Sequence, residues 1–185
     1  MTEQTNPPYV LTLWYKPGQT MQGLIKSGGG HRLALVVAMF FGLVQAVRFY
    51  ITNADAGFAY YIVGSLAGFV GLYLFAWLLR NFGRWFGGQA TTREVRVALG
   101  LGLSPWLLLF LALVFVLGGD TDPTALASYY WLFFLGFFYG YVILLLSLAT
   151  ALRLSVLKTF LCLIVTFLVS LFPLTLLIQI ATSVV

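Results

Sequence analysis

Five long apolar stretches alternate with short polar connections along the chain. Each is long enough to cross a bilayer, because a hydrocarbon core of about 30 Å takes roughly 20 helical residues. The pattern therefore predicts an all-α polytopic membrane protein with five transmembrane helices. We predict these spans over residues 31–52, 57–79, 95–117, 128–152 and 156–182.

Residues 1–30 precede the first predicted span and carry a weaker apolar pattern. Met21, Leu24 and Ile25 recur at i, i+3 and i+4, which is typical of one face of a short helix. Such a helix cannot span a bilayer and fits the membrane interface, with a loosely held tail as the alternative. The segment is polar and proline-containing, unlike a signal peptide. We expect a cytoplasmic tail with an interfacial helix here, followed by one membrane domain over 31–185.

The composition strengthens the membrane prediction. The chain has 185 residues, of which 61% are hydrophobic and only 8% are charged, with a mean hydropathy of +0.98. Soluble domains carry about 25% charged residues. Too little polar surface exists to cover a water-soluble globule. After five spans, no room remains for a separate soluble domain.

The charges predict an orientation. Basic residues precede the first span and fill the connections between the second and third spans and between the fourth and fifth. Asp55, Asp120 and Asp122 lie in the two remaining connections. Because cytoplasmic loops are enriched in Lys and Arg, the N-terminus is predicted to be cytoplasmic and the C-terminus outside. The net charge of +5 then reflects topology, and we expect no nucleic-acid partner.

Arg48 departs from this pattern, since it lies inside the first predicted span. At about 1.5 Å per residue, it sits roughly 23 Å into the membrane, near the outer edge. One interpretation is an interfacial anchor whose long stem reaches outward and pairs with Asp55 or Asp120. The other is a residue that contacts a substrate, because charged residues within spans are costly and often functional.

The connection between the second and third spans has the most detailed local pattern. Gly87 and Gly88 permit a tight reversal of the chain. Thr91 and Glu94 have the spacing of a capping box, which marks the start of a helix. The basic residues Arg93 and Arg96 flank Glu94. We interpret the connection as a shaped turn that also fixes orientation, with partner binding as the alternative.

Small residues and prolines mark the helix faces. Glycine and alanine at i, i+4 spacing let helix backbones approach closely, and we expect them to hold the bundle together. The pairs are Gly64 with Gly68, Ala98 with Gly102, and Gly136 with Gly140. Pro105 and Pro173 each predict a kink, with Ser104 and Ser170 bonding the freed carbonyls. These kinks either shape the helices or mark a moving gate, and a homo-oligomer through a small-residue face stays open.

Catalytic chemistry is poorly represented. A single histidine, His31, and a single cysteine, Cys162, cannot form a metal site. No acidic residue lies within a predicted span, so neither a carboxylate pair nor a proton relay is expected. We therefore predict no enzyme, no cofactor and no metal. The polar residues within the spans either line a polar path or bond helix to helix.

Three segments together resemble the Yip family of Ypt/Rab-interacting membrane proteins, in its short prokaryotic form. The first runs from Leu13 through Trp14 to Pro17, with Thr20 following. The second is the Phe86-Gly87-Gly88 turn with its basic helix start at Arg93 and Arg96, and the third is Gly102-Leu103-Ser104-Pro105. The resemblance covers nearly the whole chain and implies an all-helical, five-span membrane domain without catalytic residues.

The resemblance implies a membrane scaffold or adaptor that acts in membrane organisation or trafficking-like partner binding. The alternative is a small transporter, channel or lipid-translocating protein. Expected partners are the lipid bilayer, anionic lipid, a protein at the cytoplasmic face and a second copy of the chain. Eukaryotic members carry a long cytosolic N-terminal region that this sequence lacks. We therefore expect a bacterial cytoplasmic membrane, with the Golgi or ER membrane as the alternative.

Overall fold

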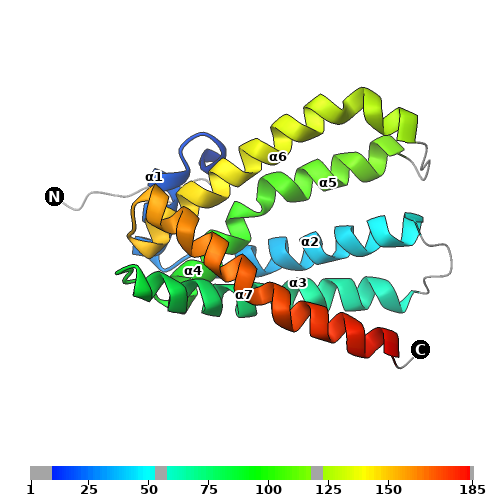
Figure 1. The fold of residues 1–185 in the computed structure, drawn as a ribbon. Helices are drawn as coiled ribbons and strands as arrows, with labels where there is room; N and C mark the ends of the chain where they lie inside the picture. The colour runs from blue at the N-terminus through cyan, green and yellow to red at the C-terminus, as the bar shows by residue number, and fades with distance from the viewer. Residues whose placement is uncertain (1–9, 53–57, 118–122, 184–185) are drawn as a thin grey trace.

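The structure is a computed structural model that describes residues 10–52, 58–117 and 123–183, and every regular element in those ranges is a helix (Figure 1). The all-α prediction is thus confirmed. In chain order the elements are η1 (Val10–Trp14), α1 (Pro17–Ser27), α2 (His31–Thr52), α3 (Ala59–Trp85), α4 (Thr92–Gly102), α5 (Ser104–Leu117), α6 (Pro123–Leu152) and α7 (Val156–Ser183).

Within the described residues, four helical stretches are long and apolar enough to cross a membrane. They are His31–Arg48, Ala59–Trp85, Thr92–Phe115 and Tyr129–Leu152, with Val156–Leu171 as a shorter apolar helix. The first four predicted spans therefore correspond to helices of spanning length. The fifth span and the orientation stay predictions.

Several element boundaries differ from the prediction; for example, α6 begins at Pro123, five residues before the predicted start at 128. Helix α3 continues to Trp85, beyond the predicted end at 79, because no strong helix breaker occurs before the glycine pair at 87 and 88. The predicted third span is two helices, α4 and α5, which meet at Leu103. Pro105 lies in the first turn of α5, where its missing N–H removes no helical hydrogen bond, so the proline starts a new helix.

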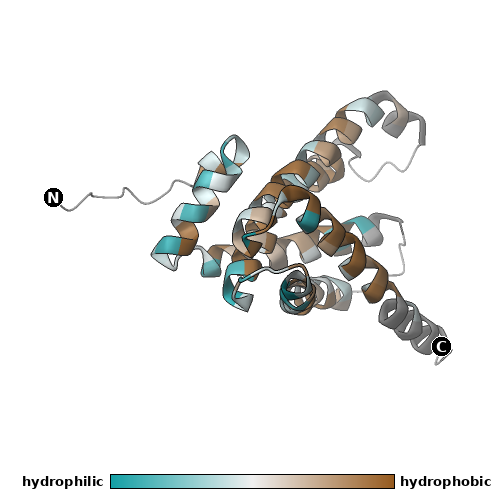
Figure 2. Cartoon of the chain, turned by 60° about the vertical axis from the view of Figure 1, so that its left-hand side comes forward, coloured by the Kyte–Doolittle hydropathy of each residue, from teal (hydrophilic) through white to brown (hydrophobic). Residues whose placement is uncertain are grey.

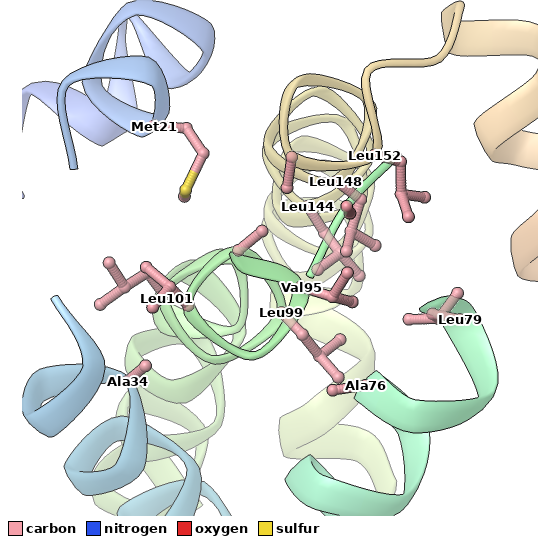
Figure 3. Packing of buried hydrophobic residues seen from close by; sticks show 14 of the residues in the cluster. Met21, Ala34, Ala76, Leu79, Val95, Leu99, Leu101, Leu144, Leu148 and Leu152 are labelled. Carbon is pink, nitrogen blue, oxygen red and sulfur yellow. The ribbon is translucent and has the colours of Figure 1, made fainter. Parts of the chain in front are cut away.

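Helix α4 lies between α2, α3 and α6 and packs against all three (Figure 3). It is buried continuously from Val97 to Gly102. A Cβ added to Gly100 would lie 2.7 Å from the Ala34 carbonyl oxygen on α2, and one on Gly102 would lie 2.7 Å from Leu144 Cδ1 on α6. The absent side chains allow α2 and α6 to approach α4 closely.

The outer helix pairs are held by the predicted small residues. A Cβ added to Gly68 would lie 2.2 Å from the Ala38 carbonyl oxygen, and one on Gly64 would lie 2.4 Å from Ala46 Cβ. These contacts join α3 to α2. Gly140 similarly accommodates the Trp106 ring of α5 on α6. The packing role predicted for the small-residue motifs is confirmed.

The N-terminal helix α1 is packed into the bundle. Leu13 and Met21 are fully buried and Leu24 is 5% exposed, all within the same core as α4. The Tyr139 hydroxyl of α6 donates a hydrogen bond to the Trp14 carbonyl oxygen. Polar residues gather on α1 and at the neighbouring helix ends, while the helix shafts are apolar (Figure 2). Residues 10–27 are therefore not a loosely held tail.

Candidate functional site at the basic end

All lysines and arginines except Arg48 lie at the end of the bundle that carries α1, which we call the basic end (Figure 1). It comprises α1, the first two turns of α2, α4 and α7, the last two turns of α3, and the end of α6 with Arg153 after it. Glu94 is the single acidic residue within the described ranges. The basic residues are Lys16, Lys26, Arg32, Arg80, Arg84, Arg93, Arg96, Arg153 and Lys158.

The glycine pair joins α3 to the end of α6. Gly87 has a φ of 90°, a conformation that L side chains rarely adopt. A Cβ on Gly88 would lie 2.9 Å from the Gly83 carbonyl oxygen and 3.0 Å from that of Leu152. The Gln89 amide donates to the same Leu152 oxygen at 3.2 Å. Glycine is therefore required at both positions, for conformation at the first and for close approach at the second.

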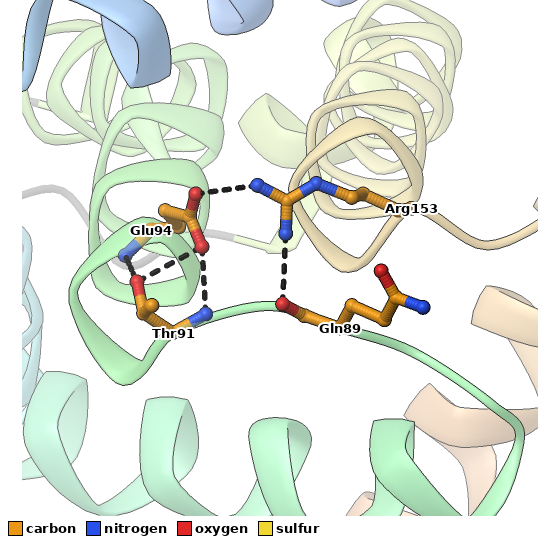
Figure 4. A network of polar contacts seen from close by, with 4 residues as sticks. All are labelled: Gln89, Thr91, Glu94 and Arg153. Atoms are coloured by element: carbon orange, nitrogen blue, oxygen red, sulfur yellow. Dashed lines mark hydrogen bonds and ion pairs between the residues drawn. The ribbon is translucent and has the colours of Figure 1, made fainter.

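The predicted capping box at the start of α4 is confirmed (Figure 4). The Glu94 amide donates to Thr91 Oγ1 at 3.3 Å, and the Thr91 amide donates to Glu94 Oε2 at 2.6 Å. The Thr91 hydroxyl also donates to Glu94 Oε2 at 2.9 Å. These bonds satisfy backbone groups at a helix start that would otherwise lack partners.

Arg153 closes this network from α6, which the sequence did not predict (Figure 4). Its guanidinium donates to the Gln89 carbonyl oxygen at 2.8 Å and forms an ion pair with Glu94 Oε1, also at 2.8 Å. The carboxylate side chain is 17% exposed and the arginine side chain 48%. Since these residues are 59 or more positions apart in the chain, no local pattern indicates the contact.

Arg93 and Arg96 also make specific contacts within the bundle. Arg93 donates to the Gly28 carbonyl oxygen at 2.8 Å, just beyond the end of α1. The Arg96 guanidinium carbon lies 4.3 Å from the centre of the Tyr73 ring on α3, within the range of a cation–π interaction. Both arginines therefore fix helices to one another at the basic end.

Pro17 belongs to the same end. It begins α1, where its fixed φ suits a helix start, and its side chain is buried. Thr12 and Thr20 share a hydrogen bond of 2.5 Å that ties η1 to α1. The Trp-to-Thr motif of the family resemblance is thus a compact local fold that seats α1 against α6.

The structure places Arg48 away from the basic end. Its Nη1 donates to Gln45 Oε1 at 2.8 Å, and its guanidinium carbon lies 4.5 Å from the centre of the Phe110 ring on α5. Asp55 and Asp120 fall outside the described residues, so their pairing with Arg48 stays a prediction. The Arg48 side chain therefore extends from α2 to α5.

The two prolines are also remote from the basic end, and their serine partners do not bond as predicted. Pro173 lies within α7 and lacks the N–H that would bond the Val169 carbonyl, four residues earlier. Pro105 starts α5, so it frees no carbonyl within a helix. The Ser104 hydroxyl makes no hydrogen bond. Ser170 donates to the carbonyls of Thr166 and Phe167. Serine hydroxyls within helices commonly donate to carbonyls three or four residues earlier, and Ser170 follows this pattern.

A cavity of about 520 Å³, which we call the central cavity, lies inside the bundle among helices α2 to α7. Its wall is formed by residues from α2 through α7, and only Gln45 and Thr166 carry polar side chains. The Thr166 hydroxyl donates to the Cys162 carbonyl of its own helix at 2.8 Å. The cavity is therefore apolar, and its wall offers no continuous polar path.

The long apolar helices, with nine of the ten basic residues gathered at one end, define an integral membrane protein built as a helical bundle. A family model for the Yip1 domain matches residues 11–177, so the chain belongs to the Yip1 family. The match includes η1 and α1 as well as the apolar helices. Comparisons with curated proteins and with solved structures gave no match.

Proposed function

We propose that this Yip1-family protein is a non-enzymatic membrane scaffold or adaptor, and that the basic end is its docking surface. The observation that carries the proposal is the concentration of positive charge at one end. Glu94 is the one acidic residue in the part of the chain that the structure describes, and it is already paired with Arg153. Seven of the cations are exposed, and five of these have no role in the contacts described above: Lys16, Lys26, Arg32, Arg84 and Lys158.

In the proposed orientation the basic end faces the cytoplasm. The positive-inside rule supports this, together with five spans and an external C-terminus. Anionic lipid attracts each nearby lysine or arginine by about 1 kcal/mol, so the basic end would also attract anionic lipid headgroups. The protein partner would present an acidic segment, since opposite charge steers association. We propose the bacterial cytoplasmic membrane as its location, with the Golgi or ER membrane as the alternative.

Charge reversal tests the proposal. The doubly substituted Lys26→Glu and Arg84→Glu protein is compared with the charge-conserving Lys26→Arg and Arg84→Lys protein. Both are crosslinked in native membranes, and the partners are quantified by mass spectrometry. We expect wild type and the conserving variant to enrich the same protein, and the reversed variant to lose at least 10-fold of it. Equal partner profiles for all three would contradict a docking role for the basic end.

The alternative function, a small transporter, channel or lipid-translocating protein, makes a different prediction. Solute passage needs polar groups along a path, whereas the central cavity has two polar wall residues, one of them bonded within its own helix. We therefore expect reconstituted protein to give no ion flux and no lipid scrambling above protein-free vesicles. Robust flux would favour the alternative.

A further inference from the structure

The central cavity has the volume and the apolar wall expected of a binding site for an apolar ligand. Its volume of about 520 Å³ falls within the roughly 300–1,000 Å³ that is usual for ligand sites. Phe167, which lines it, is 60% exposed, so the cavity is not sealed from its surroundings. In a membrane-embedded bundle those surroundings are lipid chains. Water gains few hydrogen bonds from an apolar wall, so hydrocarbon is the better occupant.

A positive charge, that of Arg48, lies next to one wall residue of the cavity. Gln45 lines the cavity and accepts a hydrogen bond from Arg48 at 2.8 Å, one helical turn further along α2. Phe41 also lines it, and its ring lies 5.8 Å from that of Phe110, over which the Arg48 guanidinium is placed. Two wall residues thus connect the cavity to Arg48. A ligand with a hydrocarbon chain and an anionic head would fit both the apolar wall and the neighbouring arginine.

We infer that the cavity is a binding site for one anionic phospholipid, with an acyl chain between the helix pairs and the phosphate next to Arg48. Arginine binds phosphate oxygens through several directed donors, which suits this headgroup. Arg48 lies at the end of α2 opposite the basic end, so the lipid belongs to the leaflet on that side. The inference stands apart from the proposed docking function, and either can fail alone.

Gly71 provides a direct test. It lines the cavity, and a Cβ added there would meet nothing within 4 Å. A large side chain at this position can therefore enter the cavity without displacing backbone. The adjacent Val70 is 59% exposed and does not line the cavity, so Val70→Phe is the matched control for Gly71→Phe.

The experiment is native mass spectrometry of protein in mild detergent with an equimolar mixture of phosphatidylglycerol and phosphatidylcholine. We expect wild type and Val70→Phe to retain one phosphatidylglycerol, and Gly71→Phe to lose at least 10-fold of it. Arg48→Gln should bind both lipids alike. Retention by Gly71→Phe equal to the control would overturn the site, and equal binding of both lipids by wild type would overturn the role of Arg48.

A second measurement uses wild-type protein, so it does not depend on how the variants fold. Phosphatidylglycerol with a diazirine in its acyl chain is photo-crosslinked and the labelled residues are mapped. Labelling of cavity residues such as Gly71, Leu163 and Trp106 supports the inference. Labelling confined to outward faces such as Trp131 and Leu135 overturns the inference. It is also overturned if the purified protein is a lipid-free dimer in which a second copy fills the cavity.

Discussion

The backbone of Arg153 has a φ of 57°, in the left-handed region, immediately after the last turn of α6. Glycine is the usual residue at such a helix end. Here the arginine side chain reaches both the Gln89 carbonyl and the Glu94 carboxylate. The contacts that it makes across the basic end offset an unfavourable backbone conformation.

Substitutions at Arg153 should separate these two effects. Arg153→Ala and Arg153→Gly both lose the ion pair and the bond to Gln89, but only glycine relieves the left-handed backbone. We expect the alanine variant to unfold more easily than the glycine variant by about 1 kcal/mol. The measurement is the unfolding midpoint of detergent-solubilised protein. A glycine variant no more stable than the alanine variant would show that the backbone conformation is not strained.

The capping box makes a second prediction at single positions. Replacing both Thr91 and Glu94 by alanine should lower the stability of α4 by about 1–2 kcal/mol, because backbone groups at the helix start lose their partners. Thr92→Ala, one residue into the helix, is the control and should change little. Thermal unfolding in detergent measures both. Equal melting temperatures for the double variant and the control would contradict the cap.

Helices α2 and α3 form an intimate pair because glycine replaces larger residues at their contact. Gly68→Ala would place a Cβ 2.2 Å from the Ala38 carbonyl oxygen, which only a shift of one whole helix can relieve. We expect a loss of at least about 1 kcal/mol, in the range of overpacking. The melting temperature of purified protein reports the loss.

Gly71→Ala is the matched control, three residues further along the same helix. Its Cβ meets nothing within 4 Å, and alanine favours helix over glycine by about 1 kcal/mol. This variant should therefore melt at the wild-type temperature or above it. A loss equal to that of Gly68→Ala would contradict close approach as the cause, because helix propensity favours alanine at both positions.

The helices were largely predictable, whereas the joints between them were not. The apolar runs and the Thr91–Glu94 spacing are local patterns, and both reappear in the structure. The division of the third span at Leu103 was expected only as a kink, because a proline pattern does not distinguish a bend from a new helix start. The Arg153 contacts and the central cavity depend on how distant segments pack, which no periodicity encodes.

The whole molecule is polarised, with all lysines and arginines except Arg48 gathered around α1 at one end. If this arrangement reflects the positive-inside rule, a cysteine at the basic end faces the cytoplasm. In a Cys162→Ala background, Asp120→Cys should react with an impermeant maleimide on intact cells. Arg84→Cys should react only after the cells are permeabilised. The reverse labelling pattern would overturn the proposed orientation.

The seating of α1 also sets an order of assembly. Leu13 and Met21 are buried in a core that α4 and α6 complete, and Arg93 holds the Gly28 carbonyl at the end of α1. Because α1 precedes α4 and α6 in the chain, it is synthesised before these partners. We therefore expect α1 to stay at the bilayer surface during synthesis, with its apolar face toward the lipid. It can reach its final position only once α4 and α6 are in place.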